Sequence, residues 1–116
     1  MLAPLFITPR CTTRSSVMSQ LARLSKQQIQ AALTSLPHWR VTHDGLKIHR
    51  TLQFKDFNQA FGFITRVALH ADKHDHHPHW SNIYNKVKIE LWTHDVGGLS
   101  EKDISLASFI DSIDSD

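Results

Sequence analysis

The sequence predicts a small α+β domain: a four-stranded antiparallel sheet with three helices on one face, in the order α-β-β-α-β-β-α. Two observations support this fold class. Three stretches carry apolar residues at steps of three and four, which is typical of helices, and between them lie two pairs of short segments with strand character. Short turns within each pair favour hairpins, and hairpins make a sheet antiparallel. The 116 residues suffice for one such domain.

Composition excludes several classes of protein. Cys11 is the single cysteine, so an internal disulfide framework and a cysteine-based zinc site are excluded. No run of apolar residues is long enough to span a membrane. The net charge is +2, but no acidic residue precedes Asp44, so the basic excess belongs to the N-terminal part and the remainder is mildly acidic. Direct binding of nucleic acid is therefore not expected, because it needs a concentrated basic face.

Residues 1–23 are expected to lie outside the domain, which then occupies residues 24–116. The first 20 residues are rich in Ser, Thr and Pro, include two arginines and lack acids. This composition suits a mitochondrial or plastid transit peptide, and equally a plain disordered tail. A cytoplasmic or mitochondrial location follows as the expectation.

The first helix is predicted to begin after Ser25. Ser25 and Gln28 have the spacing of a capping box, and Leu24 and Ile29 stand at the positions of a hydrophobic staple. Pro37 is expected to stop this helix.

The first pair of strands is predicted at residues 39–43 and 46–54. Asp44 and Gly45 form a favourable two-residue turn between them, because glycine accepts a positive φ. Arg50 interrupts the apolar alternation and is expected near an edge of the sheet. The inward-facing residues are predicted to be Leu46, Ile48, Leu52 and Phe54.

A central helix is predicted from Asp56, as its cap, to about Lys73. It carries two apolar stripes. The first, expected to pack on the core, comprises Phe57, Ala60, Phe61, Ile64, Ala68 and Ala71. The second comprises Phe63, Val67, His70 and His74, and either a partner subunit or a wider core covers it.

The second pair of strands is predicted at residues 81–84 and 86–93, and a last helix follows the Gly97–Gly98 loop. In the longer strand, Val87, Ile89, Leu91 and Thr93 share one face. Ser100 and Asp103 repeat the capping logic of the first helix. The inner face of the last helix is predicted to comprise Ile104, Ala107, Ile110 and Ile113.

Histidine is the unusual residue: there are nine, five of them between His70 and His79. His70 and His74 stand one helical turn apart, which suits a metal pair. The alternative is acid–base chemistry by His76 and His77, because an imidazole titrates near physiological pH. For His70, His74 and His79 the simplest interpretation is solvated side chains.

A longer pattern of residues makes the interpretation of these histidines more specific. Asp72-x-x-x-His76-His77-Pro78, followed by Tyr84, His94 and Asp103, resembles the signature of the pterin-4a-carbinolamine dehydratases. The flanking segments FKDFNQAFGFITRVAL and WSNIYNKVKIELWTHDVGGLS fit as well, and the resemblance covers Leu24 to Ile113. Asp72 stands where the family usually has Glu. Trp92 stands where small hydroxyl residues are common, which would reshape one wall of the site.

The resemblance implies a specific reaction: dehydration of 4a-hydroxytetrahydropterin to quinonoid dihydropterin and water, in tetrahydrobiopterin recycling for aromatic amino acid hydroxylases. It implies His76, His77 and His94 as acid, base and polarising groups, with no metal and no cofactor, since the pterin is the substrate. Asp72 and Asp103 would support the histidines from behind. The implied substrate contacts are Asp75, His76, His77, Pro78, Trp80, Trp92, Thr93, His94 and Asp95.

The resemblance also implies assembly as a homodimer through sheet edges or a homotetramer through the central helix. A hydroxylase is one implied protein partner. Another is a transcription factor, because some animal relatives act as the dimerisation cofactor of a homeodomain protein. Two other classes stay open: a non-catalytic binding module of the same fold, such as a coactivator or assembly factor, and a histidine-rich metal carrier.

Overall fold

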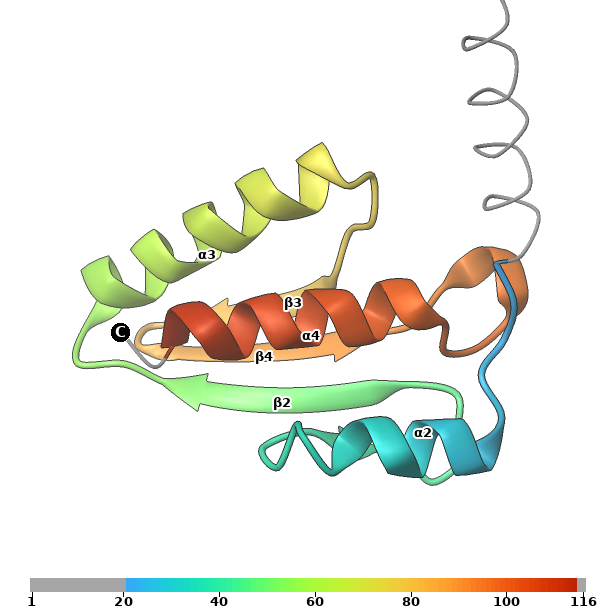
Figure 1. Cartoon of the computed structure of the whole chain (residues 1–116). Coiled ribbons are helices and arrows are strands. Elements are labelled where there is room, and N and C mark those ends of the chain that lie inside the picture. The colour runs from blue at the N-terminus through green and yellow to red at the C-terminus, as the bar shows by residue number, and fades with distance from the viewer. Residues whose placement is uncertain (1–20, 115–116) are drawn as a thin grey trace, which may run out of the picture.

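The computed structural model describes residues 21–114, and the predicted order of elements is confirmed (Figure 1). The interpretations of residues 1–20 as a transit peptide or a tail lie outside the described residues. The elements are α2 (Lys26–Leu33), β1 (Arg40–Val41), β2 (Ile48–Gln53), α3 (Phe57–Lys73), β3 (His79–Ile83), β4 (Lys86–Leu91), the short 3₁₀ helix η1 (His94–Val96) and α4 (Glu101–Asp114).

The four strands form one antiparallel sheet in the order β1-β2-β4-β3. One face of the sheet is buried under the helices: along β4, Val87, Ile89 and Leu91 are buried, while Lys86 and Lys88 are exposed. The core combines this face with apolar residues of all three helices, namely Ile29, Ile48, Leu52, Ala60, Phe63, Val67, Val87, Ile89, Leu91, Leu106, Ala107 and Ile110. The α+β class is therefore confirmed.

The start of α2 agrees with the prediction. The Gln28 N–H donates to the Ser25 hydroxyl at 3.1 Å, and the Ser25 N–H donates to the Gln28 side chain at 2.8 Å. Leu24 and Ile29 are buried, as a staple requires. The Leu24 N–H also donates to the Leu99 carbonyl at 2.7 Å, which ties the segment before α2 to the segment before α4.

The hairpin between β1 and β2 is longer than predicted. The Thr42 N–H donates to the Lys47 carbonyl at 2.8 Å, so four residues rather than two form the loop. Gly45 supplies the expected positive φ of 74°. The Asp44 carboxylate accepts from the Thr42 hydroxyl at 2.6 Å and the Leu46 N–H at 3.0 Å, and these bonds lower the pKa of Asp44.

Arg50 interrupts the apolar pattern because it makes ion pairs with α4. Its guanidinium lies 2.5 Å from Asp111 and 2.6 Å from Asp114. The same Asp111 oxygen accepts from the Trp39 indole N–H at 2.8 Å. These contacts fix the C-terminal part of α4 against β2 and the segment before β1. β1 pairs only with Ile48 and His49 of β2. From Arg50 onward this side of β2 is therefore an edge of the sheet, as predicted.

The assignment of the two stripes on α3 was right only in part: Ala60 and Ala71 pack on the core as predicted, but Phe63 and Val67 join them there, as in the wider-core alternative. Asp56 caps the helix as expected, accepting from the Gln59 N–H at 2.8 Å. The stripe that packs on the core is Ala60, Phe63, Val67 and Ala71, whereas Phe57, Phe61 and Leu69 are 48%, 55% and 69% exposed. Both stripes are apolar, so periodicity alone did not distinguish the one that meets the sheet.

The inner face of α4 differs in part from the predicted one. Ala107 and Ile110 are buried as expected, but Ile104 and Ile113 are half-buried. Asp103 and Leu106 complete the buried stripe. A carboxylate therefore occupies the first buried position of this helix.

Candidate active site

The C-terminus of α3 presents the histidine pair. The Asp75 N–H donates to the Asp72 carbonyl at 3.2 Å, and the His76 N–H donates to the Ala71 carbonyl at 3.0 Å. This is a Schellman motif, with Asp75 in the left-handed conformation at φ 52° where glycine is usual. The motif ends the helix sharply and directs the chain through His76 and His77 into β3.

Behind His76 lies a buried carboxylate. His76 Nε2 is 2.6 Å from Asp103 Oδ1, and the Asp103 side chain is fully buried. The second oxygen of Asp103 accepts from the Thr93 hydroxyl at 2.7 Å and the Ser100 N–H at 3.0 Å. Because a carboxylate accepts, the proton of this contact lies on His76 Nε2, and Nδ1 is left for a ligand.

A short chain of hydrogen bonds reinforces this arrangement. Since Thr93 donates to Asp103, the Ser100 hydroxyl donates to Thr93, at 2.5 Å. Ser100 in turn accepts from the Lys102 N–H at 3.3 Å. In residues 21–114, no buried side-chain polar atom lacks a partner. The network thus caps α4 and fixes the orientation of His76 at once.

A pocket of about 220 Å³, here called the histidine pocket, brings most of the predicted site together. Seven of the residues lining it were predicted as catalytic or substrate-binding, and Lys102 is the one that was missed. The lining residues are Asp75, His76, His77, Trp92, Thr93, His94, Asp95 and Lys102.

His94 and Trp92 reach the pocket from the end of β4. The Thr93 N–H donates to the Gly98 carbonyl at 2.8 Å, which closes the loop that contains η1 and presents His94 at its start. Lys47 Nζ lies 4.2 Å from the centre of the Trp92 ring, a cation–π contact that holds this wall. An adjoining hollow of about 240 Å³ is lined by His77, Pro78, His79, Trp92 and His94, which places Pro78 beside the site.

Trp80 lies differently from expectation, and Asp72 makes only a weak form of the expected contact with the histidine pair. Trp80 packs against the core and lines a separate hollow with His79 and Ser81 rather than the histidine pocket. Asp72 approaches His77 at 3.4 Å, and both side chains are exposed, so this contact is long and weak. Asp103 provides the buried support.

The other three histidines between positions 70 and 79 differ in their exposure. His74 and His79 are exposed, as the simplest interpretation expected. His70 is partly buried, because its ring stacks on Phe109 with centroids 3.7 Å apart. Burial, then the charges of His74 and Lys73, lowers the pKa of His70 below 6.5. Within residues 21–114, no three His, Cys, Asp or Glu side chains are grouped to hold a metal ion.

Of the two residues that support the site, Asp103 was expected from the family resemblance and also left a signal in the sequence pattern, whereas Lys47 was missed. Asp103 stands three, four and seven residues before Leu106, Ala107 and Ile110, so it lies on their buried stripe. An acid on an apolar stripe indicates a buried partner. Lys47 had no comparable signal, because it reaches Trp92 from a distant hairpin.

None of the helices in the described part of the chain is long and apolar enough to cross a membrane.

The chain is similar to several known proteins. Residues 22–113 match the family model described as pterin 4 alpha carbinolamine dehydratase. A provisionally named pterin-4-alpha-carbinolamine dehydratase of Novosphingobium aromaticivorans is 51% identical over 79% of this chain and 96% of its own. A Synechococcus protein with the same provisional name is 52% identical over 78% of this chain and 95% of its own. The crystal structure of a transcriptional coactivator/pterin dehydratase from Brucella melitensis superposes with a TM-score of 0.77 at 42% identity, covering 78% of this chain and 97% of that one.

Proposed function

Because this chain belongs to the pterin-4a-carbinolamine dehydratase family, we propose that it removes water from 4a-hydroxytetrahydropterin to give quinonoid dihydropterin. The observation that carries the proposal is the meeting of His76, His77 and His94 in one pocket, from two segments of the chain. The buried contact from Asp103 to His76 fixes one of the three rings. Two imidazoles are then free to exchange protons with the substrate.

The reaction needs one proton delivered and one removed. The hydroxyl at C4a is a poor leaving group, and a proton from an imidazolium lets it depart as water. The proton on N5 passes to a neutral imidazole, and the electrons of the N5–H bond form the C4a=N5 double bond. We assign these two roles to His77 and His94, each typically worth about 10²–10⁴-fold. His76 Nδ1 accepts a hydrogen bond from the substrate and holds the ring.

The other walls of the pocket suit a flat heterocycle. Trp92 offers an aromatic face, and Asp75 and Asp95 offer acceptors for the amino and ring N–H groups of a pterin. We expect no metal and no organic cofactor to take part, so a chelator should leave the rate unchanged. The product would pass to a reductase, which places the reaction in tetrahydrobiopterin recycling for aromatic amino acid hydroxylases. In this proposal the enzyme works in the cytoplasm or in mitochondria.

The decisive experiment is a dehydration assay on chemically generated 4a-hydroxytetrahydropterin. His77→Ala and His94→Ala should each lower the rate by about 10²-fold or more. The two 4a stereoisomers are assayed separately, because their hydroxyls leave from opposite faces and each histidine can serve one of them. His76→Ala should weaken pterin binding at least as much as turnover. His38→Ala, an exposed histidine away from the pocket, is the matched control. A double His77→Ala, His94→Ala variant that dehydrates both isomers at the unaltered rate would refute the assignment.

A second candidate function is a binding module of the same fold, such as a transcriptional coactivator or an assembly factor. It is favoured by the naming of the Brucella relative as a transcriptional coactivator and by the exposed Phe57, Phe61 and Leu69 on α3. These residues also suit a homodimer or homotetramer, and an aromatic amino acid hydroxylase or a transcription factor is the protein partner we would test. The inactive double histidine variant separates the two functions: it should still bind a partner if binding is independent of catalysis.

A further inference from the structure

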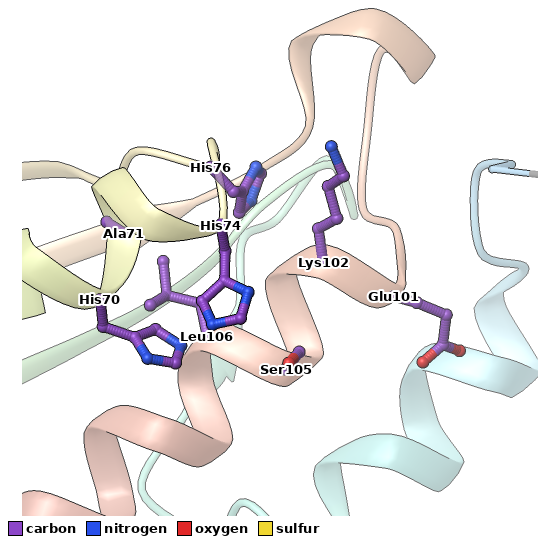
Figure 2. A pocket seen from close by; sticks show the side chains of 8 residues that line it. All are labelled: His70, Ala71, His74, His76, Glu101, Lys102, Ser105 and Leu106. Carbon is purple, nitrogen blue, oxygen red and sulfur yellow. The ribbon is translucent and has the colours of Figure 1, made fainter. Parts of the chain in front are cut away.

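A second pocket adjoins the histidine pocket, between the end of α3 and the start of α4 (Figure 2). It measures about 310 Å³ and is here called the α3–α4 pocket. His76 and Lys102 line both pockets, so they form a shared wall. The remaining lining residues are His70, Ala71, His74, Glu101, Ser105 and Leu106.

The sizes of the two pockets argue that a ligand extends across this wall. Sites for small molecules usually measure roughly 300–1,000 Å³. The histidine pocket, at about 220 Å³, and the hollow of about 240 Å³ beside Pro78 are each below that range, and the α3–α4 pocket is larger than either. A ring held by the three catalytic histidines would therefore leave room for its substituent in the α3–α4 pocket.

The charges differ between the two pockets. Asp75 and Asp95 line the histidine pocket, and both are absent from the α3–α4 pocket. In Figure 2 the Lys102 amine lies at the end of the pocket where His76 lies, whereas the Glu101 carboxylate points away from the other labelled side chains. No residue in the described part of the chain forms an ion pair with Lys102. An anionic group would thus be repelled from the first pocket and attracted to the wall of the second.

Other residues that line the α3–α4 pocket also offer donors to an anion. The rings of His70 and His74 lie side by side, with centroids 4.3 Å apart. Stacking on Phe109 covers a face of the His70 ring and leaves the N–H at the ring edge able to donate. Ser105 adds a hydroxyl. An ammonium, imidazoles and a hydroxyl are the donors from which anion sites are built.

We propose that the α3–α4 pocket receives an anionic substituent of the pterin, a phosphate or a carboxylate, and that Lys102 recognises it. This inference rests on the proposed dehydration activity and adds the class of substrate to it. Lys102 is thereby a specificity-determining residue, and substrates with a charged tail are the preferred ones.

The experiment compares three tetrahydropterins after conversion to their 4a-hydroxy forms: the 6-hydroxymethyl compound, its phosphate monoester and a 6-carboxymethyl analogue. The enzyme should show a kcat/KM about 10-fold higher for an anionic substrate than for the neutral one, as expected for a charge-assisted contact. Lys102→Gln should abolish the preference, and Lys102→Glu should reverse it. Lys55→Gln, at an exposed lysine before the opposite end of α3, should retain it.

The outcomes distinguish a phosphate from a carboxylate as the preferred group, and they test the anion site separately from the dehydratase activity. A preference for the phosphate alone, or for the carboxylate alone, identifies which group the pocket takes. Equal kcat/KM for all three substrates, or a preference that survives in Lys102→Gln, overturns the inference and leaves the dehydratase proposal standing. If the enzyme dehydrates none of the three substrates, the dehydratase proposal is refuted. Binding of fluorescent 6-hydroxymethylpterin and its phosphate ester, measured in parallel, then still decides whether Lys102 selects the anion.

Discussion

Asp103 combines two tasks at the scale of a single residue. Its carboxylate receives hydrogen bonds from Ser100 and Thr93 at the start of α4, and it holds His76 Nε2. Asp103→Asn replaces one acceptor oxygen by an amide donor, so at least one of these bonds is lost. We expect the free energy of unfolding to fall by about 1–3 kcal/mol. We also expect turnover to fall by about 10-fold or more, because His76 loses its orientation.

Asp111→Asn is the matched control for that prediction. Asp111 lies on the same helix and accepts from Arg50 and Trp39, far from the pocket along α4. Its loss should lower the free energy of unfolding by a similar amount and leave kcat unchanged. Chemical denaturation and steady-state kinetics measure the two effects. If both variants lose stability and neither loses turnover, Asp103 is a helix cap alone.

His70 should make stability depend on pH. Its pKa is lowered in the folded protein, chiefly by burial, so the unfolded chain binds the proton more strongly. The free energy of unfolding should therefore decrease as the pH falls through 6.5 toward the folded-state pKa. His70→Phe retains a ring against Phe109 but does not titrate. Denaturation curves between about pH 7.5 and 5.5 should show a flatter dependence in this variant. An unchanged slope would exclude His70 as the source.

At the scale of elements, the junction of α3 and β3 is the most sensitive. Asp75 adopts a positive φ of 52°, which glycine tolerates and a β-branched residue does not. Asp75→Gly should fold as well as the unaltered chain. Asp75→Val should cost about 1–2 kcal/mol and disturb the histidine pair that follows. Thermal unfolding and pterin affinity test both statements, and equal stability of the two variants would argue against strain at this turn.

The sequence predicted those elements whose signals are local. Ser25 and Gln28 specify the start of α2 because a capping box lies within one helical turn, and the alternation along β4 identifies its buried face. The four-residue loop between Thr42 and Lys47 was missed because Asp44 and Gly45 also fit a shorter turn. The support of His76 by Asp103 was expected from the family resemblance and not from local pattern, because the two residues are 27 positions apart and such contacts exist only once the fold is formed.

At the scale of the whole molecule, the exposed face of α3 should decide assembly. Phe61 is 55% exposed and Phe63 is 5% exposed, so one stripe of the helix faces solvent and the adjacent stripe faces the core. Phe61→Glu should dissociate a homo-oligomer while the subunit remains folded. Phe63→Glu should instead unfold the subunit, since it places an unpaired charge in the core. Sedimentation velocity and circular dichroism distinguish these results. An intact oligomer in Phe61→Glu would direct attention to the sheet edges.

The shared use of Asp103 has a consequence for inheritance. A residue needed for folding is retained by selection even after catalysis has ceased to matter. A descendant that became a binding module would be expected to lose His77 or His94, whose rings are exposed, and to keep the buried Asp103. The exposed histidines, and not the buried carboxylate, would then distinguish active members of the lineage from those that kept only the fold.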